Sequence, residues 1–423
     1  MKTAVNTFFT IAILLLMAVP AYIWQTHEGL WDDFSITENR PLERFGTYWT
    51  DLKTSIKRVL AGDLETAYEE YFVRIAERTL QEQILKAAAD QFPRRLNLIE
   101  GAKAYDRALI SGTYGLTAMP AIPASLDTDY FILRDAPVFL LEPKQPGYVG
   151  LKTVENQAKN YSEIMKAFPN INFYVFYIER VDLSPVNPLN PWYRNLDMGS
   201  SFDQFLDIKP PRLEVSSMKL DSFEDHKILF YNTDHHWNIR GAWKGYSIIY
   251  NMLSQIYPEI SPKLEVQEFR AVEGVDFCGS FARRTLYPCT PEPFEYAVVD
   301  LPPYRTWVDG EETAYGKRDA YLRGEFNNHP YTNHYSEFFG NVVDEVFYRF
   351  ENGSERDLLI IGGSHSQAVQ LYIAAHYRTT YVVDLRAFGE FDFSDAVEEY
   401  GIDDVLVLGD IIVYGRSGWE IKL

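Results

Sequence analysis

Short apolar segments alternate with segments of helical periodicity along much of this chain. The predicted strands cover residues 137–141, 171–177, 227–231, 358–361, 380–383 and 405–408, and the predicted helices cover residues 153–168, 239–256, 366–376 and 393–400. Buried strands that alternate with helices form a parallel sheet with right-handed crossovers, so we predict an α/β fold with helices flanking the sheet. Functional sites in such folds form in the loops at the carboxyl ends of the strands.

The composition is that of a folded, acidic protein. The 423 residues are 46% apolar and 24% charged, which is typical of a globular chain rather than a disordered one. This length is enough to bury the core of one large domain or of two smaller ones. The formal net charge of −20 argues against nucleic acid as a partner, because binding a polyanion requires a basic surface.

Residues 1–24 have the pattern of an export segment. Lys2 is followed by an uncharged, apolar run from residue 8 to residue 24, close to the minimum length for a membrane span. Such a run indicates a signal peptide or an uncleaved signal anchor, and a buried core helix is the alternative. Trp24 favours the anchor, because tryptophan suits a membrane interface. We therefore expect an extracytoplasmic protein, either anchored in the membrane through its N-terminus or secreted.

The rest of the chain divides into two predicted parts. Residues 25–95 predict a helical, membrane-proximal lead-in that contains a helix at 64–89. Residues 96–423 predict the α/β domain. Within it, residues 259–357 are rich in Pro, Tyr, Phe and Asn and have weak periodicity. We expect them to form an irregular insertion that covers the edge of the sheet.

Two loops that are distant in sequence carry the residue types of a nucleophilic site. Residues 231–237 contain Asp234 and His236, and residues 360–366 place Ser364 between a predicted strand and a predicted helix. A serine hydroxyl becomes a nucleophile when a neutral imidazole accepts its proton and a carboxylate orients that imidazole. In an extended loop the side chains of Asp234 and His236 project the same way. The sequence thus predicts a Ser/His/Asp site for acyl chemistry.

The surroundings of Ser364 predict an oxyanion site. Gly363 permits a sharp turn and a close backbone approach. A helix starting just after Ser364 aims its backbone N–H groups at the site, with the Ser364 N–H as the first donor. The side-chain amide of Asn341 is a second candidate, and Trp237 can form a wall beside the imidazole of His236.

Several alternatives stay open at this point. His365 and Ser366 are alternatives to His236 and Ser364 as base and nucleophile. The Asp-His-His-Trp tetrad that ends at Trp237 can also be interpreted as a metal site, although nothing nearby completes a tetrahedral ligand set. We expect no metal and no cofactor. Cys278 and Cys289 are too sparse for a zinc site, and they are either a local disulfide, as in many exported proteins, or two buried thiols.

The segment Thr233-Asp234-His235-His236-Trp237 resembles the signature of the DHHW proteins, which are similar to the SGNH-hydrolase-like domain of alginate O-acetyltransferases. Further segments of this chain match that family in order, namely residues 277–280, 338–341, 361–364, 376–377 and 383–386. The resemblance implies an SGNH-hydrolase-like, flavodoxin-like fold over roughly residues 60–415. It departs from the family at Gly363, where many members have an aspartate.

The resemblance implies an exported O-acetyltransferase or esterase. Ser364 would carry the acyl group, His236 would act as base and then acid, and Asp234 would orient it. Arg386 would either hold a substrate oxygen or form a structural ion pair. The implied partners are a polysaccharide acceptor and a multi-span membrane O-acyltransferase that supplies the acetyl group. A carbohydrate esterase and a catalytically inactive polysaccharide-binding or assembly protein are the alternatives.

Overall fold

A computed structural model describes residues 34–35, 40–42, 89–90, 95–144, 149–193, 200–387 and 391–415. The chain divides into two compact units, residues 1–108 and residues 109–423. The predicted export segment and all but the last residue of the predicted helix at 64–89 lie outside the described residues. Within these residues, no helix has both the length and the apolar character that a membrane span needs.

In the first unit, two short strands pair antiparallel, and Arg40 Nη2 lies 2.6 Å from Asp90 Oδ1. The strands of the chain are β1 (Phe34–Ser35), β2 (Arg40–Pro41), β3 (Ala121–Pro123), β4 (Tyr130–Leu133), β5 (Phe139–Leu141), β6 (Asn172–Ile178), β7 (Glu214–Met218), β8 (Val266–Ala271), β9 (Glu295–Val299), β10 (Tyr304–Val308), β11 (Glu311–Glu312), β12 (Glu345–Phe350), β13 (Asp357–Gly362), β14 (Thr379–Val383) and β15 (Asp404–Gly409).

The helices vary widely in length. They are α6 (Arg95–Tyr114), α7 (Leu151–Ala167), α8 (Ser200–Ile208), α9 (Phe223–Leu229), α10 (Ile239–Ile256), α11 (Ser280–Thr285), α12 (Arg318–Leu322), α13 (His334–Phe339), α14 (Gln370–Ala374), α15 (Phe393–Tyr400) and α16 (Ile412–Gly415), with short 3-10 helices η2 (Val181–Leu183), η3 (Asn190–Trp192) and η4 (Ser366–Ala368).

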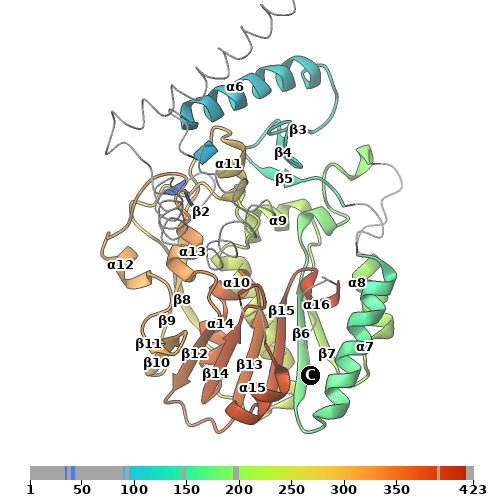
Figure 1. Ribbon diagram of the computed structural model, residues 1–423, viewed down its shortest axis with the longest axis vertical. Helices are drawn as coiled ribbons and strands as arrows, with labels where there is room; N and C mark the ends of the chain where they lie inside the picture. Colours follow the sequence, from blue (N-terminus) through green and yellow to red (C-terminus); the bar gives the residue numbers. More distant parts are fainter. Residues whose placement is uncertain are drawn as a thin grey trace, which may run out of the picture. The chain divides into compact units, whose positions relative to one another are not determined.

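An eight-stranded mixed sheet forms the centre of the second unit (Figure 1). Its order is β11-β10-β12-β14-β13-β15-β6-β7, and the strands from β14 to β7 run parallel. This confirms the predicted α/β fold. Strands β10, β11 and β12 pair antiparallel, and they belong to the segment expected to be an irregular insertion. That part of the segment therefore extends the sheet, because an open strand edge gains hydrogen bonds by pairing.

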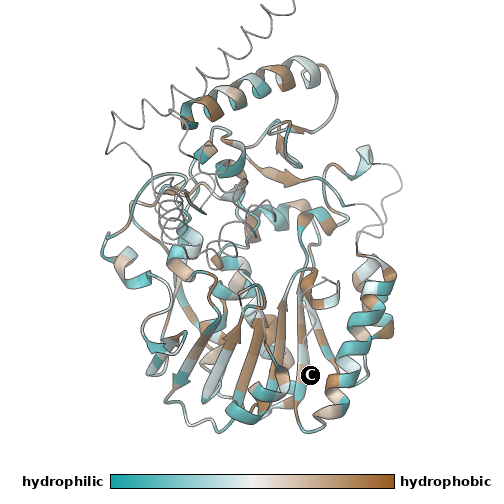
Figure 2. Cartoon of the chain, viewed as in Figure 1, coloured by the Kyte–Doolittle hydropathy of each residue, from teal (hydrophilic) through white to brown (hydrophobic). Residues whose placement is uncertain are grey.

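Both faces of the parallel strands are buried, as their uninterrupted apolar sequences predict. Along β13, Leu358 and Ile360 belong to the core beneath α10 and α14, whereas Leu359 and Ile361 belong to the core beneath α7 and α15. This alternation follows the two-residue period of a strand. Figure 2 shows the apolar centre of the sheet. The carboxyl ends of β13, β15 and β6 consequently share one edge of a rigid, two-sided core.

The structure differs from the sequence prediction at three elements. Residues 227–231 are not a strand, because Ser222 and Asp225 form a capping box that starts helix α9. The helix predicted over residues 366–376 is broken into η4 and α14. Strand β5 exists, but it pairs antiparallel with β4 in a separate three-stranded sheet. Helices α7, α10 and α15 and strands β6, β13, β14 and β15 match their predicted segments.

Candidate active site

Asp234 and His236 form a hydrogen-bonded pair in the loop that precedes α10. His236 Nδ1 lies 2.7 Å from Asp234 Oδ1, and the backbone N–H of His236 donates to the same oxygen at 3.0 Å. A bridge between Phe230 and Trp237 closes the loop at its base. The loop is thus bent rather than extended as we had expected. The bend lets one carboxylate orient both the backbone and the ring of His236.

The Asp234 carboxylate is buried and fully engaged. Its second oxygen accepts a hydrogen bond of 2.6 Å from the Ser280 N–H, and His235 Nδ1 lies 3.1 Å from its first oxygen. Burial by itself would raise the pKa of Asp234. The imidazoles of His236 and His235 outweigh that effect and hold the pKa well below its usual range. Asp234 is therefore a permanent carboxylate that orients an imidazole.

His236 is a neutral base with one free nitrogen. Burial, reinforced by the neighbouring His235, lowers the pKa of His236 to about 4. Because Nδ1 faces a carboxylate, its proton lies there, and Nε2 is left as an acceptor. Within the described part of the chain, Nε2 is buried and has no hydrogen-bond partner. An unpaired buried acceptor is rare in folded proteins, and this one is suited to receive a proton.

Tyr335 links the histidine to the serine loop, and no local sequence pattern points to it. Its ring stacks on the His236 imidazole with centroids 3.9 Å apart and planes 9° apart. Its hydroxyl donates to the Ser364 carbonyl oxygen at 3.1 Å. The wall beside the imidazole is thus Tyr335 rather than Trp237, which instead donates from Nε1 to the His365 carbonyl at 3.0 Å.

The two loops that the sequence singled out therefore converge. Ser364 lies just past the end of β13 and is partly exposed. Neither the Ser364 hydroxyl nor His236 Nε2 has a hydrogen-bond partner among the described residues, so the contact between nucleophile and base is not formed here. Such contacts are often loose before substrate binds.

The structure distinguishes Ser364 from the alternative Ser366. Ser366 is 2% exposed, and its Oγ lies 2.8 Å from the Gly363 carbonyl oxygen and 3.1 Å from Gln370 Oε1. A Cβ added at Gly362 would lie 2.7 Å from Ser366 Cβ, so this glycine is required for close packing. Ser366 thus holds the turn together, whereas Ser364 is partly exposed.

His365, the alternative base, is enclosed and packs against the pair. Its ring centroid lies 5.2 Å from that of His236, and its Nε2 lies 3.3 Å from the His235 carbonyl oxygen. Burial, reinforced by the neighbouring imidazole of His236, lowers the pKa of His365 to about 3. No carboxylate of the described residues hydrogen-bonds to its ring, so His236 has the better environment for a base.

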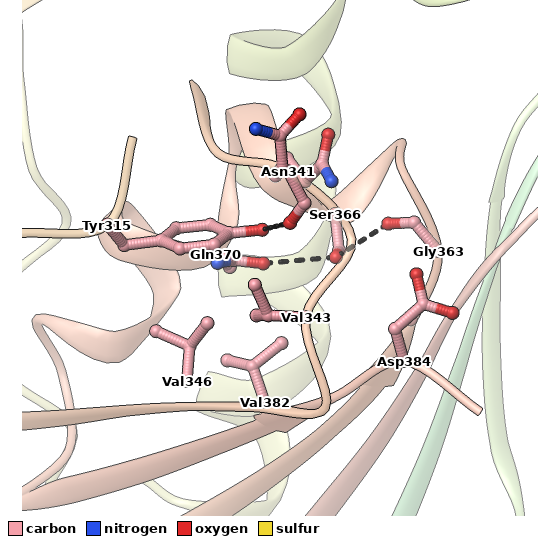
Figure 3. Close-up of a pocket in the computed structure, with 11 residues that line it drawn as sticks. Tyr315, Asn341, Val343, Val346, Gly363, Ser366, Gln370, Val382 and Asp384 are labelled. Atoms are coloured by element: carbon pink, nitrogen blue, oxygen red, sulfur yellow. Dashed lines mark hydrogen bonds between the residues drawn. The ribbon is translucent and has the colours of Figure 1, made fainter. Parts of the chain in front are cut away.

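A pocket adjoins the serine loop on the side of β12 and β14, and Figure 3 shows its lining. Asn341 is exposed on its rim, and its carbonyl accepts a hydrogen bond of 2.7 Å from the Tyr315 hydroxyl. The apolar side consists of Val343, Val346 and Val382. Asn341 and Gly363 thus line the same pocket.

In this region the structure shows which of the two alternatives for Arg386 is formed, and it corrects the expectation of a helix after Ser364. Arg386 forms an ion pair with Asp384, with Nε 2.9 Å from Oδ1, which is the structural alternative predicted for it. The helix expected to aim its dipole at Ser364 is only the short η4 followed by α14. A helix of about one turn has only a small dipole, so the backbone N–H groups near Ser364 would stabilise an oxyanion mainly through individual hydrogen bonds.

The loop that contacts Asp234 is closed by a disulfide. Cys278 and Cys289 are bonded, which decides between the two states left open by the sequence. Asp234, His235 and His236 are also the described residues that could share a metal ion, since their ligand atoms lie within 4.8 Å of one another. Both Nδ1 atoms and both carboxylate oxygens are already hydrogen-bonded, so the set fits an acid–base pair better than a cation.

An α/β sheet with a buried Asp–His pair beside a serine loop defines this site. No protein-family profile and no curated protein matches the sequence. Bacillus cereus PatB1 superposes with a TM-score of 0.55 at 20% identity, covering 69% of this chain and 100% of that one. The structure of Bacillus cereus PatB1 with a sulfonyl adduct superposes with a TM-score of 0.55 at 16% identity, covering 70% of this chain and 99% of that one.

A DHHW family protein from Eubacterium siraeum has a TM-score of 0.52 at 16% identity, covering 72% of this chain and 95% of that chain. At these identities the likeness is one of fold. The chain thus has the fold of a DHHW family protein and of PatB1, which confirms the fold that the sequence resemblance implied.

Proposed function

We propose that this protein is an O-acyltransferase that forms an acyl-enzyme on Ser364. The observation that supports this most is the buried pair of Asp234 and His236, which leaves Nε2 unpaired in a loop that Tyr335 and Trp237 tie to the serine loop. That arrangement provides an oriented, neutral base in a loop that is linked to the loop of a partly exposed alcohol. These are the elements that serine nucleophiles require.

The proposed reaction has two halves. In the first, Ser364 Oγ attacks the acyl carbonyl while its proton moves to His236 Nε2. The oxyanion lies near the Ser364 N–H and the Asn341 amide, and the leaving group departs with the proton from His236. In the second half an acceptor hydroxyl attacks the ester and gives its proton to His236. The bond from the acyl carbon to Ser364 Oγ then breaks, and Ser364 Oγ takes that proton back from His236. Asp234 stabilises the imidazolium in both halves.

We propose an acetyl group as the acyl group and a cell-surface or secreted polysaccharide as the acceptor. The resemblance of the Thr233–Trp237 segment to the DHHW proteins supports this choice. The apolar export segment at residues 1–24 supports an extracytoplasmic location, either anchored or secreted. A multi-span membrane O-acyltransferase is the proposed acetyl donor, because acetyl groups have to cross the bilayer to reach such a site.

Covalent labelling tests the nucleophile directly. An aryl sulfonyl fluoride is a suitable probe, since PatB1 has been solved with a sulfonyl adduct. The serine oxygen forms the S–O bond, fluoride leaves, and His236 takes the proton. We expect peptide mass mapping to place the label on Ser364, and His236→Ala to slow labelling by roughly 10²-fold or more. A label confined to Ser366 or His365 would contradict the assignment.

The acceptor is tested separately. With an aryl acetate and an added oligosaccharide, a transferase yields an acetylated sugar that mass spectrometry detects, whereas an esterase yields only acetate. A correctly folded chain that neither takes the label nor turns over the ester would instead be a binding or assembly protein.

The low pKa of His236 predicts an unusual pH profile. Because the base must be neutral, kcat/KM falls as the pH drops through the pKa of the free enzyme. An ordinary histidine places that fall near pH 6.5, but burial lowers the pKa of His236 to about 4. We expect kcat/KM for an aryl acetate to stay flat from pH 8 to about pH 5. The background rate, measured with Ser364→Ala at each pH, is subtracted from the rate of the native protein. Circular dichroism at each pH shows whether the protein is folded. An inflection between pH 6 and 7 would contradict this.

A further inference from the structure

One loop of the chain holds the Asp234 segment at several points. The backbone N–H of Gly279 donates to Thr233 Oγ1 at 2.9 Å, and that of Phe281 donates to the Thr233 carbonyl at 3.0 Å. Between them, the Ser280 N–H donates to Asp234 Oδ2. A Cβ at Gly279 would lie 2.3 Å from the Asp234 Cβ, so the two segments are packed as closely as a glycine allows.

The far end of the same loop holds the same segment through a carboxylate. Glu292 Oε1 accepts from the Thr233 N–H at 2.9 Å and from the Thr233 hydroxyl at 2.5 Å. Its Oε2 accepts from the Asn232 N–H at 2.8 Å and from the Asn232 side chain at 3.2 Å. Within the described part of the chain, no lysine or arginine forms a salt bridge with this carboxylate, so all its hydrogen bonds here come from residues 232 and 233.

The two ends of the loop are joined. Cys278 and Cys289 form the disulfide, and the Glu292 N–H donates to the Phe277 carbonyl oxygen at 3.0 Å. The hydroxyl of Thr233 lies between the two ends, accepting from Gly279 and donating to Glu292. The Thr233 hydroxyl thus joins the two ends of the loop by hydrogen bonds. Thr233 is the residue directly before Asp234, so this contact holds the backbone next to Asp234.

We infer that Thr233 and Glu292 are positioning residues for the acid–base pair, fixing the Asp234 carboxylate so that His236 presents Nε2 to the serine. This inference rests on the proposed function. A displacement of about 1 Å in a catalytic group can cost roughly 10²-fold in rate. Among the described residues, the hydrogen-bond contacts of Asp234 are to His235, His236 and Ser280, so the backbone on its N-terminal side has to be held by other residues.

The matched pair Thr233→Val and Thr233→Ser tests this inference. Valine keeps the shape of threonine and removes the hydroxyl, whereas serine keeps the hydroxyl. In the full chain with an aryl acetate, we expect Thr233→Val to lower kcat by roughly 10-fold to 10²-fold with KM changed by less than about twofold. Thr233→Ser should stay within about threefold of the native kcat. Glu292→Gln, which keeps the size of the side chain, should resemble Thr233→Val.

A spectroscopic signal provides a readout that does not depend on turnover. The proton between His236 Nδ1 and Asp234 should give a proton resonance far downfield of the amides, assigned by its loss in His236→Ala. We expect it to broaden or move upfield in Thr233→Val and to persist in Thr233→Ser. If the native chain shows this resonance but no esterase activity and no sulfonyl label, the proposed function fails while the positioning is still tested.

A native kcat together with a native downfield resonance in both Thr233→Val and Glu292→Gln would overturn the inference. If Thr233→Val does not fold, Glu292→Gln alone decides. A loss of kcat in Thr233→Ser as large as that in Thr233→Val would also contradict the inference. Serine keeps the hydroxyl, so the missing hydroxyl could not then be the cause of the loss.

Discussion

Ser364→Ala should reduce kcat/KM for an aryl acetate by at least roughly 10³-fold and remove the initial burst of released phenol. The residual activity would come from binding and oxyanion stabilisation without a covalent intermediate. The burst is measured by stopped-flow absorbance, and the missing acyl-enzyme is confirmed by intact mass. The effect is large because no other partly exposed hydroxyl of the serine loop can replace the lost oxygen.

Ser366→Ala is the matched control, since it removes a hydroxyl two residues away in the same turn. Ser366 is buried and its hydroxyl contacts the Gly363 carbonyl and Gln370. Its removal should lower the free energy of unfolding by about 1 kcal/mol and leave kcat within about threefold. If Ser366→Ala abolished the burst and Ser364→Ala did not, the two serines would have to exchange roles.

Asp234→Asn should lower kcat/KM by roughly 10³-fold to 10⁴-fold. Asp234 has two oxygens that accept from His236 Nδ1 and from the Ser280 N–H, but an asparagine has only one acceptor oxygen. If that oxygen faces Ser280, the amide donates to Nδ1 and forces the proton onto Nε2. The imidazole then cannot take the proton of Ser364.

The measurement combines kinetics with the downfield proton signal, which should disappear in Asp234→Asn. Asp203→Asn is a suitable control, because Asp203 is exposed and its carboxylate pairs with Lys219 at 3.0 Å on the surface. Asp234→Asn should also destabilise the fold, since it leaves a buried donor or acceptor unpaired, at a cost of about 1–3 kcal/mol. A variant that kept native kcat/KM would show that Asp234 does not orient the base.

The secondary structure was predicted best where the apolar pattern is local and strong. Helix α10 has the predicted bounds, and its Asn238 cap accepts from Arg240 and Gly241 as helix caps do. Strands β13 and β15 are buried on both faces and match their apolar runs. The strand predicted at residues 227–231 was wrong, because its apolar run overlaps helix α9, which begins at a capping box. There the local start signal outweighs strand propensity.

The candidate site was predicted in its chemistry but not in its contacts. The sequence identified the Asp234–His236 pair, and the structure confirms their hydrogen bond. It assigned to Trp237 the contact that Tyr335 makes, and it gave no role to Tyr335, Thr233 or Glu292. These residues act through contacts such as the one between Trp237 and His365, which are 128 residues apart. No periodicity or spacing encodes such a contact.

The sequence by itself determines most of the strands and helices and the acidic net charge. It also places a carboxylate, an imidazole and an alcohol in two loops. These features depend on residues that are neighbours in the chain. Which serine is accessible, which ring covers the imidazole and which loop holds Asp234 were decided only when the fold brought the two loops together. Burial of the pair then lowers the pKa of His236, and this keeps its imidazole neutral.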